Sequence, residues 1–237
     1  MDSIPQELID TIIDNVPKSS LLSCSLVARR WRRKSQRRAL DTISFLFEGE
    51  VNCWCTDIAQ DSDGISSYVR HVRIYEIPSW DEPALFSRML GSLSSLTELT
   101  ILSTHIPDES LGPISRGEFG KGITTLHLSY LSCTFAAMTS MTLSFPNLKE
   151  LWVENCEVTP EGPLPTDLVI PQRGPLNLLV LGGSWDGTGE VLAKFRLTSS
   201  RLSLDAYFKD VEQLLLLSSE TVVELGLRGA WFLRVPD

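Results

Sequence analysis

The chain has 237 residues, of which 43% are hydrophobic and 22% charged, so it is long enough to bury a substantial core and has the composition of a globular protein. No apolar run approaches the roughly 18 residues that a membrane span requires, and the first residues lack the basic and apolar regions of a secretory signal. The five cysteines are odd in number and scattered, which predicts reduced thiols. We therefore expect a cytoplasmic or nuclear protein with no membrane partner.

Charge divides unevenly along the sequence. The first forty residues hold eight Lys or Arg against four Asp or Glu, whereas the rest holds thirteen basic and twenty-six acidic residues. The basic run from Arg29 to Arg38 has the form of a nucleic-acid or nuclear-import segment. However, a domain that is acidic everywhere else would repel a phosphate backbone. We favour a solvated helix face with Trp31 turned inward, and we expect no nucleic-acid partner.

The same forty residues predict three short helices with one apolar side. Ser3 and Gln6 have the spacing of a capping box, Pro17 ends the first helix, and Ser19 or Ser20 can cap the second. Apolar residues then recur at helical spacing, namely Leu8, Ile9, Ile12, Ile13 and Val16 on the first helix, Leu22 and Leu26 on the second, and Val27 and Trp31 on the third. So short a module can hardly bury enough surface to be stable alone, so the pattern points to a partner protein.

These residues resemble the F-box family. The resemblance is carried in order by Ile4-Pro5-x-Glu7-Leu8-Ile9-x-x-Ile12-Ile13 and by Leu21-Leu22-x-Cys24-Ser25-Leu26-Val27-x-x-x-Trp31-Arg32. It departs from the family pattern at Ile4, where Leu is usual, and at Ala28, where Cys or Ser is common. The resemblance implies binding to a Skp-type adaptor, which links F-box proteins to a cullin–RING ubiquitin ligase. The residues that it places in or under the adaptor-binding surface are Ile4, Pro5, Leu8, Ile12, Leu22, Leu26, Val27 and Trp31.

A second pattern is an internal repeat of the form L-x-x-L-x-L. Its central apolar residues stand at positions 72, 99, 126, 151, 179, 202 and 225, with spacings of 27, 27, 25, 28, 23 and 23 residues. This lies within the 20–29 residue period of leucine-rich repeats. A degenerate leading unit, Thr42-x-x-Phe45-x-Phe47, would align Phe45 with Val72. Each unit predicts one strand.

Helical patterns occupy several of the intervening segments, at 84–93, 135–143, 190–195 and 207–217, with the methionines at 89, 138 and 141 as core residues. Alternating strands and helices predict an α/β fold, a curved solenoid with a parallel sheet inside. The whole resembles the F-box/leucine-rich-repeat class of substrate receptors, with the F-box domain at 1–47 and the repeats at 48–237. Five prolines predict a loop at about 158–175. Trp231-Phe232-Leu233 follows the last strand, and we expect either that it caps the open end or that the chain is shorter than its working ancestor.

Strand alternation predicts which side chains face outward from the repeats. We expect target contacts on this concave face from Arg73, Tyr75, His127, Trp152 and Glu154. Aromatic and Arg side chains are enriched where binding energy concentrates. Trp152, which stands between Glu150 and Glu154, has an alternative role, packing against the neighbouring repeat.

No motif predicts catalysis. The glycines of residues 182–189 follow a strand, but Thr188 stands where a phosphate-binding loop needs Lys. Cys53-x-Cys55 lacks the second pair and nearby His of a zinc site. We expect no enzyme activity, no cofactor and no metal.

The sequence thus predicts the substrate-recognition subunit of an SCF-type cullin–RING ubiquitin ligase, with a Skp-type adaptor and an unknown target protein as partners. Two alternatives are an F-box protein without a role in ubiquitination and a plain repeat scaffold whose helices cap the sheet. A cap would bury Leu8, Ile12 and Trp31, whereas an F-box leaves an apolar patch outside. A third alternative, a nucleotide-binding enzyme that uses residues 182–189, is the weakest.

Overall fold

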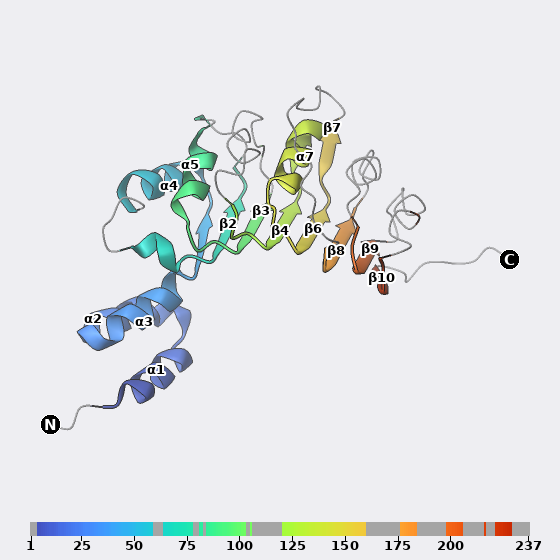
Figure 1. Cartoon of the computed structure of the whole chain (residues 1–237). Coiled ribbons are helices and arrows are strands. Elements are labelled where there is room, and N and C mark those ends of the chain that lie inside the picture. Colours follow the sequence, from blue (N-terminus) through green and yellow to red (C-terminus); the bar gives the residue numbers. More distant parts are fainter. Residues whose placement is uncertain are drawn as a thin grey trace.

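A computed structural model of the chain describes residues 4–58, 64–77, 81–82, 84–102, 105, 120–159, 176–183, 198–205, 216 and 221–228. Helices at one end of the molecule lead into a row of strands that lie side by side in chain order (Figure 1). Within these residues, no helix is both long and apolar enough to cross a bilayer.

The first forty residues form the helical unit, which consists of α1 (Gln6–Asn15), a 3₁₀ turn η1 (Lys18–Ser20), α2 (Leu21–Val27) and α3 (Arg29–Leu40). The three predicted helices are confirmed, but the predicted serine cap of the second helix is wrong. Ser20 precedes α2 without a side-chain cap, and α1 begins after Pro5, also uncapped. Proline fixes φ near the helical value and has no N–H to leave unpaired, which suits it to a helix start. Ser3 lies outside the described residues. Val27 ends α2 and does not begin the third helix.

A small core holds the helical unit together. Ile9, Ile13 and Leu21 are buried, and Trp31 packs against them together with Val16 and Ala39.

Part of the basic run in α3 fixes α1 in place. Lys34 lies 2.7 Å from the carboxylate of Asp14, and the Arg38 guanidinium donates to the backbone carbonyls of Ile13 and Val16 at the end of α1. Arg38 thus adds a donor at the carbonyl end of α1, where the Ile13 carbonyl also accepts the N–H of Val16 at 3.1 Å. Two of the basic side chains therefore stabilise the fold, and Trp31 is turned inward as expected.

The main sheet has eight strands, all parallel and ordered β1-β2-β3-β4-β6-β8-β9-β10. All seven predicted repeat strands are confirmed. The eight strands are β1 (Thr42–Phe45), β2 (His71–Tyr75), β3 (Glu98–Leu102), β4 (Thr125–Ser129), β6 (Glu150–Glu154), β8 (Leu178–Gly182), β9 (Arg201–Asp205) and β10 (Glu224–Arg228).

The leading strand β1 is real, but its predicted register is wrong. Phe45 pairs with Ile74 and not with Val72. A shift of two residues keeps the same face inward because side chains alternate, so Phe45 is buried. Phe47 lies beyond the strand and is exposed. Residues 42–45, which the sequence assigned to the F-box, are therefore the first strand of the sheet.

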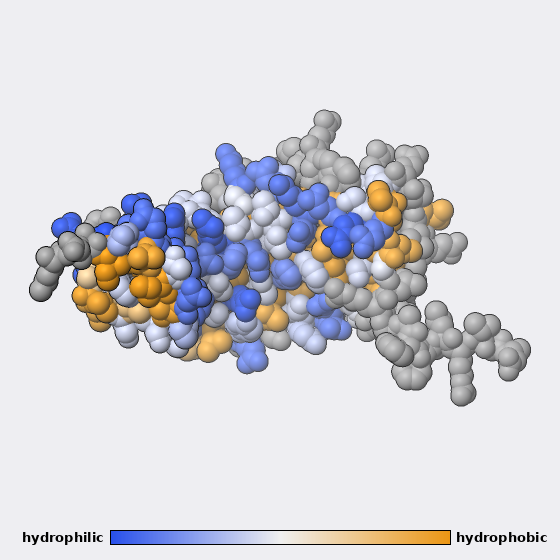
Figure 2. All heavy atoms as spheres, turned by 90° about the horizontal axis from the view of Figure 1, so that it is seen from below, coloured by the Kyte–Doolittle hydropathy of each residue, from blue (hydrophilic) through white to orange (hydrophobic). Residues whose placement is uncertain are grey.

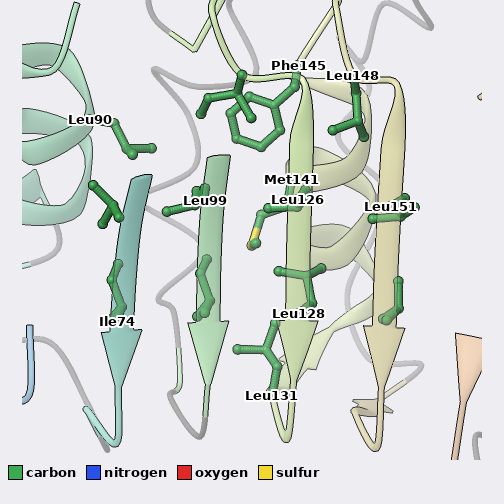
Figure 3. Close-up of a cluster of buried hydrophobic side chains, with 14 of the residues drawn as sticks. Ile74, Leu90, Leu99, Leu126, Leu128, Leu131, Met141, Phe145, Leu148 and Leu151 are labelled. Carbon is green, nitrogen blue, oxygen red and sulfur yellow. The ribbon is translucent and has the colours of Figure 1, made fainter. Parts of the chain in front are cut away.

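Helices cover the face of the sheet to which the strand leucines point. They are α4 (Glu48–Cys53), which continues into a π-helical turn η2 (Trp54–Ile58), α5 (Ala84–Ser92) and α7 (Phe135–Leu143). A 3₁₀ turn, η3 (Ile65–Tyr68), precedes β2 and lies against α3. The predicted helices at 84–93 and 135–143 are confirmed. Figure 3 shows Met141 of α7 and the nearby Phe145 packed over Leu126 and Leu99. Those at 190–195 and 207–217 lie outside the described residues, Leu216 excepted, as does Trp231-Phe232-Leu233.

A second sheet of two short strands, β5 (Ser132–Thr134) and β7 (Glu157–Thr159), follows the ends of β4 and β6. The predicted proline-rich loop therefore begins too early, since residues 158 and 159 belong to β7. The rest of that loop lies outside the described residues.

A residue with a left-handed backbone conformation follows three of the strands and links each strand end to that of its neighbour. Glu76, Tyr130 and Asn155 have φ of 50°, 54° and 51°. Each donates its N–H to the last residue of the next strand in the sheet, at 2.8–3.0 Å. The repeated turn ties neighbouring strand ends together and so keeps their outward side chains in register.

Candidate functional site

Six large apolar side chains of the helical unit are exposed, each for 44–81% of its surface. Figure 2 shows hydrophobic surface gathered on the helical end of the molecule. We call this the helical patch, and its members are Ile4, Leu8, Ile12, Leu22, Leu26 and Val27. All six were predicted as adaptor-binding residues.

Helical periodicity explains why the patch stays outside. The apolar residues of α1 divide into two stripes, with Ile9 and Ile13 turned into the small core and Leu8 and Ile12 turned outward. On α2, Leu21 is buried whereas Leu22 and Leu26 are exposed. Each stripe joins residues four apart, which lie on one side of a helix.

The two other predicted adaptor-binding residues differ in exposure. Pro5 is exposed at the start of α1, and Trp31 is only partly buried, against the core formed by Ile9, Ile13 and Leu21.

These exposures bear on whether the helices cap the sheet. A cap would place Leu8 and Ile12 against the strands, but both are exposed, at 55% and 44%. Contiguous exposed apolar surface of this kind marks a protein–protein interaction site. The geometry therefore favours a surface for a partner.

The helical unit joins the sheet through a short, hydrogen-bonded junction. Helix α3 ends at Leu40, and β1 begins two residues later. The Asp41 carbonyl accepts the N–H groups of Arg70 and His71, both at 2.9 Å, and the Asp41 carboxylate lies 3.4 Å from His71 Nδ1. Lys18 Nζ also donates to the Thr42 carbonyl at 3.2 Å. The junction therefore ties the helices that carry the patch to the first strands of the sheet.

The face of the sheet opposite the helices, the strand face, carries the predicted target-binding residues. Along β2, β3, β4 and β6, buried residues alternate with exposed or partly exposed ones. The parallel register aligns the outward residues in rows across the sheet. The middle row runs from Ser44 through Arg73, Thr100, His127, Trp152, Val180 and Ser203 to Gly226.

The structure brings some of the five predicted target-binding residues together and separates others. The rings of His127 and Trp152 stack 5.0 Å apart with an interplanar angle of 13°. Glu154 lies on the same strand as Trp152, and Arg73 lies in the same row two strands before His127. Tyr75 is three strands from β6 and does not join the stack. Trp152 thus packs on the neighbouring strand and also remains partly exposed.

Beside the stack, the sheet has a hollow of about 190 Å³ on its outward face. We call it the Trp152 hollow. After Trp152 the middle row continues with Val180, Ser203 and Gly226, whose side chains are much smaller than that of Trp152. The outward face is therefore hollowed beside the Trp152 ring. Its lining consists of Trp152, Leu178, Val180, Arg201, Leu202, Ser203, Glu224 and Gly226.

Sequence reasoning placed most of these lining residues on the outward face but did not find the hollow. Its depth depends on Val180, Ser203 and Gly226 coming from three strands into one row. The signal was the loss of bulk along the row after Trp152, which is visible only once the strands are aligned.

The environment of His127 makes a prediction about pH. Burial lowers the pKa of His127, against the opposing effect of Glu98, Glu154 and Glu150, while Arg73 adds to the lowering. The unfolded chain, with an ordinary histidine pKa near 6.5, therefore takes up a proton at a higher pH than the folded chain. Stability should fall as pH drops below about 6.5, until the folded pKa is passed.

Replacing His127 by Gln should remove this part of the acid sensitivity. We expect the melting temperature of His127→Gln to fall less between pH 7.5 and 5 than that of the wild type, as followed by circular dichroism. The test compares the change in melting temperature between the two pH values, because the loss of stacking lowers the melting temperature of the variant at both. If the melting temperatures of the wild type and the variant fell equally with pH, His127 would not be buried in its neutral form.

The described residues include no group of three or more His, Cys, Asp or Glu side chains placed to hold a metal. All five cysteines are free, and burial raises the pKa of Cys156 to about 12, which leaves its thiol unreactive. Burial also raises the pKa of Cys55. Of the predicted glycine segment, only Gly182 and Gly183 are described, and Gly183 has a φ of 92° at the end of β8. The remainder of that segment lies outside the described residues.

Comparison with known proteins identifies the helical unit. Residues 1–42 match the family model of the F-box domain, the region that contains the helical patch. No curated protein matches the chain. The N-terminal helices that expose the apolar patch are therefore an F-box domain.

Proposed function

We propose that the chain is the substrate-recognition subunit of an SCF-type cullin–RING ubiquitin ligase. In this proposal the F-box binds a Skp-type adaptor through the helical patch, and the strand face binds a target protein. The chain itself performs no chemistry. It acts by proximity, because holding a target near a ubiquitin-loaded enzyme converts an encounter between molecules into a reaction within one complex.

The single observation that carries the proposal is the helical patch itself. Its six side chains stay exposed while a separate set, Ile9, Ile13 and Leu21, fills the core beneath them. Burying such a surface against a partner is favourable by about 25 cal/mol for each Å² of apolar area. The F-box match places this surface in a domain whose members bind Skp-type adaptors.

The strand face supports the second half of the proposal. Eight parallel strands in sequence order, repeated every 23 to 29 residues, have the arrangement that we propose to be a curved leucine-rich-repeat solenoid. In such an architecture the strand side is an extended binding surface. The junction at Asp41 joins that surface to the F-box, which fits a subunit that must hold a target at a defined distance from its ligase. We further propose that the protein works in the cytoplasm or nucleus.

Expression in cells of the tagged wild-type chain beside a Pro5→Ala/Leu8→Ala double variant tests this function. Both changed residues are exposed, so the variant is expected to stay folded. The wild type should recover the adaptor and a cullin, and should lower the abundance of the proteins that it binds. The variant should still recover those proteins but should lose the cullin and leave their abundance unchanged.

Two results would contradict the proposal in different ways. If the wild type recovers the adaptor without a cullin and changes no protein's abundance, the chain is an F-box protein without a role in ubiquitination. If it recovers neither, the helical patch serves another partner, and the scaffold alternative replaces the ligase.

A further inference from the structure

The Trp152 hollow is the feature of the strand face whose chemistry is most defined. At about 190 Å³ it is smaller than the roughly 300–1,000 Å³ of a small-molecule or cofactor site, so its size suits one long side chain. Trp152, Leu178 and Val180 give it an apolar wall and floor. An extended apolar stem would therefore be favoured there over a compact polar group.

Charges around the hollow define the end of that side chain. Glu150 pairs in register with Leu178, which lines the hollow, and belongs to the outward face of β6, so its side chain leaves the sheet on the strand beside that lining residue. Within the described part of the chain, the Glu150 carboxylate forms no ion pair or hydrogen bond. Glu98 and Glu154 lie near enough to act on His127, the stacking partner of Trp152. The surroundings of the Trp152 side of the hollow are thus negative.

The cations nearby do not cancel this negative charge. Arg201 lines the far side of the hollow, but its Nε lies 2.8 Å from the Glu224 carboxylate, so the pair is neutral as a whole. Arg73 is two strands beyond the stack, on the side away from the hollow.

We propose that the Trp152 hollow binds a lysine or arginine side chain of a target peptide. The aliphatic stem would lie against Trp152, Leu178 and Val180, and the charged head would pair with Glu150. Lysine and arginine have this division, an apolar stem and a charged tip, and a cation beside the face of an indole ring gains further attraction. The proposal rests on the proposed function, since it names the class of target that the strand face recognises.

The strand face also fits a peptide in its chemistry. The charge outside the first forty residues is strongly acidic, with thirteen basic against twenty-six acidic residues, which attracts a basic segment before contact. An exposed pair of this kind is weakened by salt, so binding should weaken as ionic strength rises.

Labelled nonapeptide pools with a fixed central residue and uncharged random flanks test the proposal. One pool has Lys or Arg at the centre, one has Leu and one has Glu. Binding to the full chain is measured by fluorescence anisotropy. We expect the basic pool to bind at least about tenfold more tightly than either of the others.

Three variants locate the binding. Trp152→Ala and Glu150→Gln should each weaken binding of the basic pool by about tenfold or more. Glu157→Gln removes the same charge from the second sheet, away from the hollow, and should bind as the wild type does. Equal binding of the three pools, tighter binding of the Leu or Glu pool, no binding of any pool, or a Glu150→Gln variant that binds normally would overturn the proposal.

A parallel measurement separates this proposal from the ligase function. The Pro5→Ala/Leu8→Ala variant should bind the basic pool normally, and Trp152→Ala should bind the Skp-type adaptor normally. If adaptor binding holds and the pools fail, the hollow is not a cation site and the proposed function stands. If the pools bind and the adaptor does not, the strand face is a recognition surface on a chain that is not a ligase subunit.

Discussion

Replacing Leu26 by Asp is expected to weaken binding of a Skp-type adaptor by about 100-fold or more without unfolding the helical unit. Leu26 is 81% exposed, so a carboxylate there is hydrated in the free protein. In the complex the same carboxylate would lose its water inside an apolar contact, at a cost of about 3 kcal/mol or more. Titration calorimetry with the adaptor measures the change in affinity, and circular dichroism checks the fold.

Leu21 provides the matched control on the same helix. It is only 1% exposed and packs with Ile9 and Ile13, so Leu21→Ala should lower the stability of the helical unit by about 2–5 kcal/mol. Leu26→Asp should leave the unfolding midpoint unchanged. Equal loss of stability in both variants would mean that Leu26 belongs to a core, and the helical patch would then be no binding surface.

Leu126→Ala is expected to produce the largest loss of stability in the sheet, about 2–5 kcal/mol. Leu126 is fully buried and pairs in register with Leu99 on one side and Leu151 on the other. Figure 3 shows it beneath the side chains that α7 and Phe145 supply. Truncation leaves a cavity that rigid neighbouring strands cannot close. Guanidinium unfolding, followed by circular dichroism, measures the difference.

The adjacent residue on β4 tests whether the effect comes from the core. Thr125 points to the opposite, partly exposed face, and Thr125→Ala should change stability by less than about 1 kcal/mol. If the two variants lost the same stability, the inward and outward faces of β4 would be wrongly assigned, and with them the strand face.

The sheet was predictable because its signal is local and repeated. Leucines two apart recur at a regular period, so the pattern identified both each strand and its inward face. The register of β1 was not predictable in the same way. Thr42-x-x-Phe45-x-Phe47 satisfies the pattern, but β1 begins almost directly after α3 and its first residue pairs with His71. The short connection between α3 and β1 sets the register of β1, and the spacing of apolar residues does not contain that information.

The helical patch and the Trp152 hollow differ in how much of each could be predicted from the sequence. The helical patch was identified through a family pattern, but periodicity alone put Leu8 and Ile9 on one broad apolar side. The packing of α1 against Leu21 of α2 and against Trp31 and Ala39 of α3 turns Ile9 inward and leaves Leu8 outward. The Trp152 hollow depends on small side chains from separate strands, so no single segment of the sequence contains it.

Mixing the purified full chain with a purified Skp-type adaptor, followed by size-exclusion chromatography with light scattering, tests the central claim most directly. The F-box assignment and the exposed helical patch predict a complex with the mass of one chain and one adaptor. A folded chain that elutes apart from the adaptor at micromolar concentration would contradict that claim, because the patch would then serve some other contact.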